Sequence, residues 1–344
     1  MAYSINKILS GLLNGLSERQ RDILVGRFGL DRAGKPMTLA ALGEKYKITR
    51  ERVRQIEASA LKDLKNRVDK DDGCQAILNK GSKYLADNGG VAAQKTLLAH
   101  LESVASGITA NQLGLLLEVS AGFYFYPADK NFMAFYYLDK AGLKNAQSFL
   151  EQWASMLRGK KGEVLQGRYN AFLQEFIQRK KISSAYASNY LSLSKKMHKN
   201  PYGDIGLSEW TEIKPKTIRD RVYVVLKKKK EPLHFRAIAR TINKTFAERK
   251  PASAPTVHNE LIKDQRFVLV GRGIYALAEH GYEPGTAKEV IARILKRQGP
   301  LRPREVILAV QKERFFKANT VLVNLQNKSH FSRLDNGTYR VREV

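Results

Sequence analysis

Residues 38–64 constrain the fold of this chain more than any other stretch. Thr38 and Thr49 each precede a periodic apolar run, where a threonine hydroxyl can accept an unpaired backbone N–H at a helix start. The first run has apolar side chains at helical spacing, namely Leu39, Leu42 and Tyr46. The sequence therefore predicts two helices that meet at a tight turn, the second long and basic at its start.

The second of these helices has two chemically different faces. At about 100° per residue, one side collects Val53, Ile56, Ala60, Leu61 and Leu64. The opposite side carries Glu51, Gln55 and Lys62, the flanks carry Arg52 and Arg54, and the first turn carries Arg50. Such a helix suits the major groove of DNA, because polar groups can read base edges while flanking arginines reach phosphates. The alternative is an ordinary amphipathic helix with a solvated charged face.

Four sequence blocks carry a resemblance to a known family. In chain order they are LSERQRDIL (16–24), RFGLD (27–31), GKPMTL (34–39) and TRERVRQIE (49–57). Together they resemble region 4 of primary sigma factors of the sigma-70 family, over about residues 10–68. That resemblance implies a domain that binds the minus-35 promoter element and the flap of RNA polymerase.

The same resemblance implies roles for individual side chains. It makes Arg50, Glu51 and Gln55 the base-contacting residues, and it makes Arg52, Arg54, Thr38 and Arg19 contacts to the DNA backbone. We add Lys62 to the backbone contacts because it lies on the outward face. One position departs from the family pattern: Lys47 stands where the family often has Gly, Asp or Asn, and a left-handed lysine there would cost about 1 kcal/mol.

The charge balance indicates a polyanionic partner. Sixty Lys and Arg residues face 33 acids in 344 residues, a formal charge of +27. Nucleic acid is the partner that such an excess favours, because neutralising phosphates releases counterions; an anionic membrane surface is the alternative. No apolar run approaches the roughly 20 residues that span a bilayer. Cys74 is the only cysteine, so we expect a reducing, cytoplasmic location at the nucleoid and no disulfide framework.

The rest of the chain repeats an organisation, helices followed by a β-hairpin, which is the plan of a winged helix. The last copy has predicted helices over 287–296, 304–310 and 319–326, then strands over 331–334 and 338–341. Asn336-Gly337 between the strands fits a two-residue hairpin with positive φ at both positions. The copy before it has predicted helices over 219–228, 235–242 and 256–264, then strands over 267–270 and 274–277.

This earlier copy, residues 218–277, also resembles a named family. EPLHFRAIA (231–239), TVHNEL (256–261), RFV (266–268) and GRGIYAL (271–277) look like a HARE-type helix-turn-helix. That resemblance implies a winged fold in a nucleic-acid setting, such as polymerase accessory, chromatin or restriction proteins. Arg272 and Arg340, in the two predicted wings, are candidate contacts to phosphates.

These patterns predict a mainly α fold with small β-hairpin wings, a helix-turn-helix followed by tandem winged-helix modules. The predicted domains are 1–68, 75–138, 143–213, 216–280 and 285–344. Only the spacing of elements supports the second and third. The aromatic stretch 123–137 could stack on unpaired bases, but strand residues in a small core or a partner-facing patch explain it better.

No pattern supports an enzyme, so we predict no catalytic residue, no cofactor and no metal site. The six histidines lack metal-ligand spacing, and Cys74 is best explained as a buried structural thiol. The leading hypothesis is a bacterial DNA-binding transcription protein, sigma-like or an accessory of RNA polymerase core. A complete sigma factor is disfavoured, because no region 2 motif is present. Alternatives are an architectural nucleoid protein and the DNA-targeting subunit of a restriction or modification system. The oligomeric state is left open.

Overall fold

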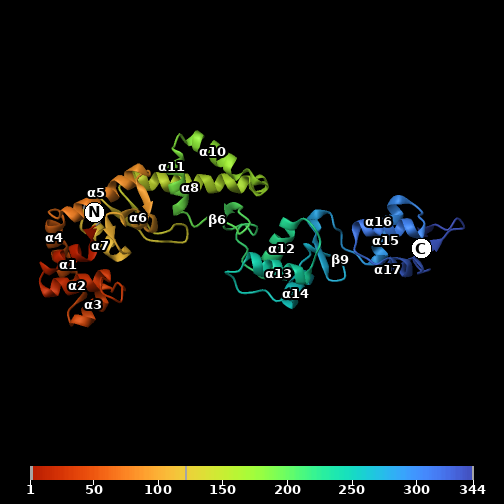
Figure 1. The fold of residues 1–344 in the computed structure, drawn as a ribbon, viewed down its shortest axis with the longest axis horizontal. Helices are drawn as coiled ribbons and strands as arrows, with labels where there is room; N and C mark the ends of the chain where they lie inside the picture. The colour runs from red at the N-terminus through yellow and green to blue at the C-terminus, as the bar shows by residue number, and fades with distance from the viewer. Residues whose placement is uncertain (1–2, 121, 343–344) are drawn as a thin grey trace. The chain divides into compact units, whose positions relative to one another are not determined.

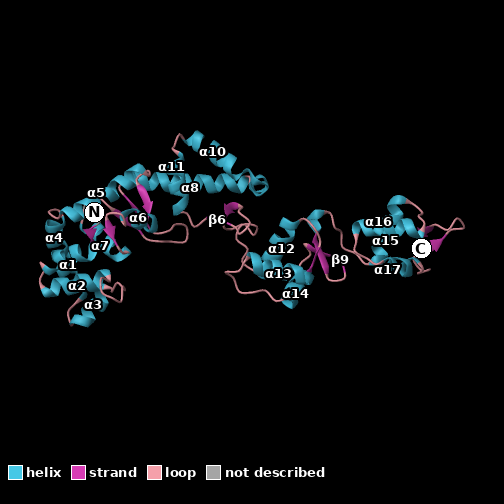
Figure 2. Cartoon of the chain, viewed as in Figure 1, coloured by secondary structure: helices cyan, strands magenta, loops and turns pink. Residues whose placement is uncertain are grey.

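The structure, a computed structural model, describes residues 3–120 and 122–342. It is mainly helical with small antiparallel hairpins, as predicted (Figure 2). Contacts divide the chain into two compact units, Met1–His198 and Lys199–Val344. Each unit is described by itself.

The first unit begins with the predicted helix-turn-helix. Its helices are α1 (Ile5–Asn14), α2 (Glu18–Phe28), α3 (Leu39–Tyr46) and α4 (Arg50–Val68). A second group follows, α5 (Asp72–Asp87), α6 (Gln94–Leu101) and α7 (Ala110–Val119), with the strands β1 (Tyr3–Ser4), β2 (Val91–Ala93), β3 (Ala105–Ser106), β4 (Tyr124–Tyr126) and β5 (Phe135–Tyr137). The antiparallel order is β2-β5-β4, whereas β1 pairs with β3 in parallel.

The two helix groups share one hydrophobic core. Ile5, Leu64 and Val68 belong to the same buried cluster as side chains of α5, α6 and α7. Figure 1 shows α1 and α4 in the same group of helices as α5 and α7. The break between α4 and α5 is short. Asp71 already caps α5, its Oδ1 accepting the backbone N–H of Cys74 at 2.8 Å, so only residues 69–71 lie between α4 and α5. Domain boundaries at 68 and 75 stay predictions.

Two expectations about side chains in this unit are confirmed. The Cys74 thiol is buried, and burial, with the nearby Asp71 charge, raises its pKa to about 12. In the aromatic stretch, Phe132, Phe135 and Tyr136 are buried, whereas Tyr124 and Phe125 of the edge strand β4 are half exposed. Three of its aromatic side chains therefore lie in a core, and the rest of the stretch is partly or largely exposed.

The first unit ends in a helical hairpin and a third helix. Its elements are α8 (Lys140–Gly159), α9 (Lys161–Glu163), the π-helical turn η1 (Val164–Arg168), α10 (Tyr169–Lys180), α11 (Ser184–Leu193) and β6 (Met197–Lys199), which crosses into the second unit. Gly167 interrupts the helical run in η1, with φ at 97° in the left-handed region, where glycine carries no steric penalty.

The second unit contains two winged-helix arrangements. The first comprises α12 (Ile218–Lys229), β8 (Leu233–His234), α13 (Phe235–Thr245), α14 (Ala254–Lys263), β9 (Phe267–Gly271) and β10 (Ile274–Leu277), with β7 (Ile205–Leu207) before it. The second comprises α15 (Ala287–Gln298), α16 (Pro303–Glu313), α17 (Ala318–Leu325), β11 (Phe331–Arg333) and β12 (Tyr339–Val341), after the 3₁₀ turn η2 (Ala278–His280). The first sheet has the order β8-β10-β9.

The turn between β11 and β12 differs from the expectation. Leu334 N–H donates to the Thr338 carbonyl at 2.8 Å, so the loop has three residues. Gly337 has φ at 80°, but Asn336 does not adopt positive φ. The Asn336 carboxamide oxygen instead accepts the Thr338 N–H at 3.1 Å. This is the three-residue hairpin in which only the last position is left-handed.

Candidate nucleic-acid interface

Two threonine caps define where the helices of the helix-turn-helix begin. Thr38 Oγ1 accepts the N–H of Ala41 at 3.1 Å, and Thr49 Oγ1 accepts the N–H of Arg52 at 3.1 Å. Both threonines have extended backbone, so each ends the preceding segment and starts a helix. The second cap places Arg50 in the first turn of α4.

The turn between α3 and α4 depends on two residues. Lys47 is left-handed with φ at 55°, and the next N–H, of Ile48, donates to the Gly43 carbonyl at 3.0 Å. A Cβ on Gly43 would lie 2.8 Å from the Ile48 carbonyl oxygen, closer than real Cβ contacts. The turn therefore requires glycine at 43 and tolerates the strained lysine at 47.

Helix α4 separates an apolar face from a polar face. Its buried residues are Val53, Ala60, Leu64 and Val68. Val53 packs with Ile23 of α2 and Leu42 of α3 in a small core. The predicted contact residues are all exposed, namely Arg50, Glu51, Arg52, Arg54, Gln55 and Lys62. The start of α4 thus projects polar side chains outward from a fixed backbone.

These outward side chains bond to one another along the helix. Arg54 donates to Glu51 through Nε at 2.9 Å and through Nη2 at 2.7 Å. Arg52 donates to the Gln55 carboxamide oxygen at 3.1 Å. The hydrogen bond with Arg54 lowers the pKa of Glu51, and the same bond raises the pKa of Arg54. Both groups therefore stay charged near neutral pH.

Side chains outside the start of α4 hold the helices of the candidate interface together. Arg19 Nη2 donates to the Tyr46 carbonyl at 3.0 Å, and its guanidinium lies 4.4 Å from the Tyr46 ring centre. Arg19 thus holds the end of α3, while the Thr38 hydroxyl accepts the cap bond. No sequence pattern indicates the ion pair of Arg27 with Glu57, whose nitrogen and oxygen lie 3.0 Å apart and which joins α2 to α4.

The two wing candidates lie in the second unit. Arg272 is exposed in the loop between β9 and β10, and Arg340 is exposed on β12. Arg340 Nε donates to Ser332 Oγ on the paired strand at 3.3 Å. Their contacts with phosphates stay predictions.

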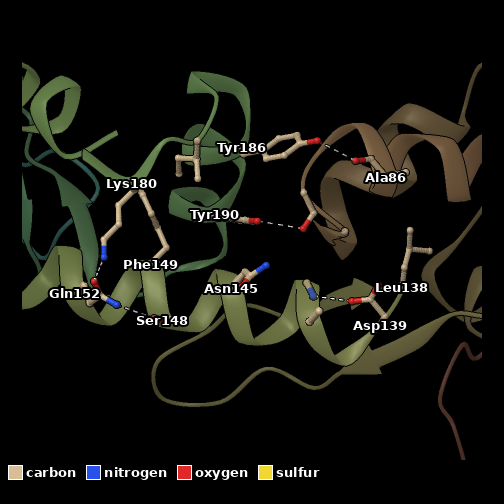
Figure 3. Close-up of a pocket in the computed structure, with 15 residues that line it drawn as sticks. Ala86, Leu138, Asp139, Asn145, Ser148, Phe149, Gln152, Lys180, Tyr186 and Tyr190 are labelled. Carbon is tan, nitrogen blue, oxygen red and sulfur yellow. Dashed lines mark hydrogen bonds between the residues drawn. The ribbon is translucent and has the colours of Figure 1, made fainter. Parts of the chain in front are cut away.

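A groove in the first unit lies where α8, α10 and α11 meet the end of α5 (Figure 3). Tyr190 donates to the Gly89 carbonyl at 3.2 Å, and Tyr186 to the Ala86 carbonyl at 3.5 Å. Lys180 and Gln152 are also bonded to each other. These polar groups already bond to other residues of the fold. The groove is therefore a weaker candidate for a functional site than the exposed start of α4.

Residues 3–120 and 122–342 contain no group of three His, Cys, Asp or Glu side chains that could hold a metal ion. No helix in these ranges is both long and apolar enough to cross a membrane.

The matches with known proteins cover the helix-turn-helix. Residues 12–66 match the family model of sigma-70, region 4. RNA polymerase sigma factor SigA1 of Synechococcus elongatus is 50% identical over 58 residues, 17% of this chain and 14% of the relative. SigA of Lactococcus lactis subsp. cremoris is 45% identical over 58 residues, 17% of this chain and 16% of the relative.

A third relative extends the match slightly. The RNA polymerase sigma-C factor of Nostoc is 45% identical over 65 residues, 19% of this chain and 15% of the relative. The chain thus spans about one seventh of the length of these relatives. The resemblance to region 4 is confirmed, whereas the HARE-type resemblance of residues 218–277 stays a prediction.

Proposed function

We propose that the helix-turn-helix binds duplex DNA in a sequence-specific manner and that the protein acts in transcription initiation at a minus-35-type element. One observation carries the proposal. The polar row that starts α4 is exposed, its opposite face is buried, and it lies within the segment that matches sigma-70, region 4. In this role α4 enters the major groove.

Each exposed side chain has a role that follows from its chemistry. Arg50 and Gln55 can each make bidentate hydrogen bonds to a purine edge, and Glu51 can accept from a cytosine amino group. Arg52, Arg54 and Lys62 neutralise phosphates beside the groove, with Arg19 and Thr38 near the ends of the footprint. The bonds between Arg54 and Glu51 and between Arg52 and Gln55 then exchange for bonds to DNA.

We further propose that the protein is an accessory of RNA polymerase rather than a complete sigma factor, located at the nucleoid in the cytoplasm. The sequence contains no region 2 motif, and its similarity to sigma factors covers only 17–19% of the chain. The winged modules of the second unit would add phosphate contacts or bind the polymerase core. The protein is not an enzyme under this proposal.

A second candidate function is that of an architectural nucleoid protein with little sequence preference. The formal charge of +27 favours this alternative, because phosphate neutralisation alone gives strong binding to any duplex. The two functions predict different results when a base-contacting side chain is removed. Sequence-specific binding should weaken on the specific duplex only, whereas architectural binding should weaken equally on specific and scrambled duplexes.

A matched pair of substitutions on α4 separates these functions. Gln55→Ala should cost about 1–3 kcal/mol of binding on a minus-35 duplex and almost nothing on a scrambled duplex. Lys62→Ala should weaken binding to both duplexes equally and reduce the salt slope by about 1. Fluorescence anisotropy at several salt concentrations measures both effects. Equal losses for Gln55→Ala on both duplexes would establish the architectural function instead.

The accessory role has its own test. With purified core polymerase and a promoter that contains a minus-35 element, we expect no open complex unless another sigma factor is added. Permanganate footprinting of unpaired thymines reports the open complex. Melting of the promoter by core and this protein alone would overturn the accessory assignment and leave DNA binding untouched.

A further inference from the structure

A second concave site lies in the second unit, where its two winged arrangements meet. The segment after α16 extends the free edge of β9. Phe315 N–H donates to the Val270 carbonyl at 2.7 Å, and Arg314 Nη1 donates to the Leu269 carbonyl at 3.3 Å. Gly271 pairs with Phe315 in parallel, and a Cβ on Gly271 would lie 2.7 Å from the Phe315 Cβ. This close approach brings the Arg314 side chain into the junction.

Arg314 is a buried cation with unused donors. Only 2% of the residue is exposed, and its Nε and Nη2 find no acceptor among the described residues. Burial lowers the pKa of this guanidinium, and the neighbouring positive charge of Arg293 lowers it further. A buried charge with unsatisfied N–H groups is costly, so it calls for an anion that the rest of the fold does not supply.

The pocket beside this guanidinium has a volume of about 310 Å³, at the lower end of the range for small-molecule sites. Six charged side chains line it, namely Glu283, Arg293, Arg297, Lys312, Glu313 and Arg314. They come from the segment after η2, from α15, and from α16 and its end.

The acidic side chains that line this pocket already form ion pairs with other cations. Glu283 pairs with Arg293 at 2.6 Å, and Glu313 pairs with Arg297 at 2.5 Å. Glu313 also lies 3.6 Å from Arg293. Among the described residues neither Arg314 nor Lys312 forms an ion pair with an acid within 4 Å, although the charges of Glu313 and Glu283 favour the charged form of Arg314. The local excess of two positive charges matches a dianion.

We propose that this pocket binds a small oxyanion of the phosphate class, with Arg314 as the anchor and Lys312 as a second cation. Planar guanidinium donors suit the paired oxygens of a phosphoryl group. A phosphate on duplex DNA is the wrong source, because the free N–H groups have almost no exposed area and only a ligand inside the pocket can meet them. A free phosphate and a small phosphate monoester share the required chemistry.

The ligand would act as a bridge between the two winged arrangements. The pocket is lined by the end of η2 and the segment that follows it, by α15 and by the end of α16. The residue after Arg314, Phe315, is hydrogen-bonded to the edge of β9. Neutralising Arg314 would favour this joined arrangement over a separated one. The inference does not depend on promoter binding by α4.

The test uses the full chain and inorganic phosphate. Isothermal titration calorimetry at constant ionic strength, set with chloride, should show one site. Arg314→Gln and Lys312→Gln should each weaken phosphate binding about tenfold or more, the loss expected for one charge-assisted contact of about 1.4 kcal/mol. Lys312 is exposed, so its variant tests the site even if Arg314→Gln unfolds. Arg304→Gln, an exposed arginine in the first turn of α16, is the control and should bind like wild type.

Further arms identify the source of the phosphoryl group. Glycerol 3-phosphate replaces inorganic phosphate in one arm, and tighter binding there identifies a monoester as the ligand. A short DNA duplex competes in the other arm and should leave phosphate bound. The proposal is overturned if wild type binds no phosphate, if Lys312→Gln binds as tightly as Arg304→Gln, or if the duplex displaces the phosphate.

Discussion

Arg54 and Arg52 restrain the exposed polar side chains at the start of α4. Each guanidinium bonds to a side chain one turn away, Arg54 to Glu51 and Arg52 to Gln55. All four side chains are exposed, so water competes for these bonds and they contribute little to stability. Their effect is on geometry, because paired side chains sample fewer rotamers than free ones. Phosphates can displace Glu51 and Gln55 from these arginines at low cost.

Gly43 is the residue on which the turn geometry depends most. Replacing Gly43 with Ala should destabilise the protein by about 1–3 kcal/mol, because the new Cβ would lie 2.8 Å from the Ile48 carbonyl and force the turn to shift. Urea unfolding measures the change. The control is Gly11→Ala in α1, where a Cβ meets nothing within 4 Å. That variant should gain up to about 1 kcal/mol from helix propensity, and equal effects at both sites would contradict the steric explanation.

At the scale of elements, α7 is the partner that holds the helix-turn-helix in place. Asn111 Nδ2 donates to the carbonyls of Gly29 at 2.9 Å and Gly34 at 3.0 Å, on the loop between α2 and α3. Gln112 Nε2 donates to the Asn6 carboxamide oxygen on α1 at 2.8 Å. One helix turn thus restrains both the start of the chain and the loop that leads into α3.

Removing the Asn111 carboxamide tests this restraint. Asn111→Ala should cost about 1–3 kcal/mol, because two hydrogen bonds to loop carbonyls are lost together. Amide hydrogen exchange should also become faster in residues 29–37. Asn79→Ala, at an exposed site on α5, provides the matched control and should not change exchange in that loop. Unchanged exchange in Asn111→Ala would mean that α7 does not order the loop.

At the scale of the whole molecule, the helix-turn-helix shares a hydrophobic core with the helices that follow it. The buried cluster that includes Ile5, Leu64 and Val68 continues into α5, α6 and α7. The parallel pairing of β1 with β3 joins Tyr3 to Ala105 across the same boundary. Cutting the chain after α4 would expose these apolar side chains to water.

A comparison of two fragments tests this continuity. Residues 1–68 alone should bind the dye ANS and lose near-ultraviolet circular dichroism, because the side chains of α5, α6 and α7 no longer cover the apolar residues of α1 and α4. Residues 1–138 should unfold cooperatively and bind little dye. A sharp unfolding transition in the shorter fragment, with no dye binding, would show that the first four helices fold independently.

The sequence by itself determined most of the helices, their caps and the exposed polar side of α4. Thr38 and Thr49 act as caps through bonds to groups three residues away, and the polar and apolar sides of α4 follow from a 3.6-residue period. Such features are local, so no knowledge of the fold is needed to predict them. The same holds for the wings between β9 and β10 and between β11 and β12, although the turn at Asn336 depended on a side-chain bond to Thr338.

Only the tertiary structure decided which of these elements depend on one another. The shared core of α1–α7, the placement of Arg19 on Tyr46, and the burial of Arg314 against β9 all join residues far apart in the chain. No periodicity encodes such pairs, because burial is a property of the packed molecule. The sequence does not distinguish one arginine of a basic chain from another. Only the packed structure shows which arginines are exposed and which are buried.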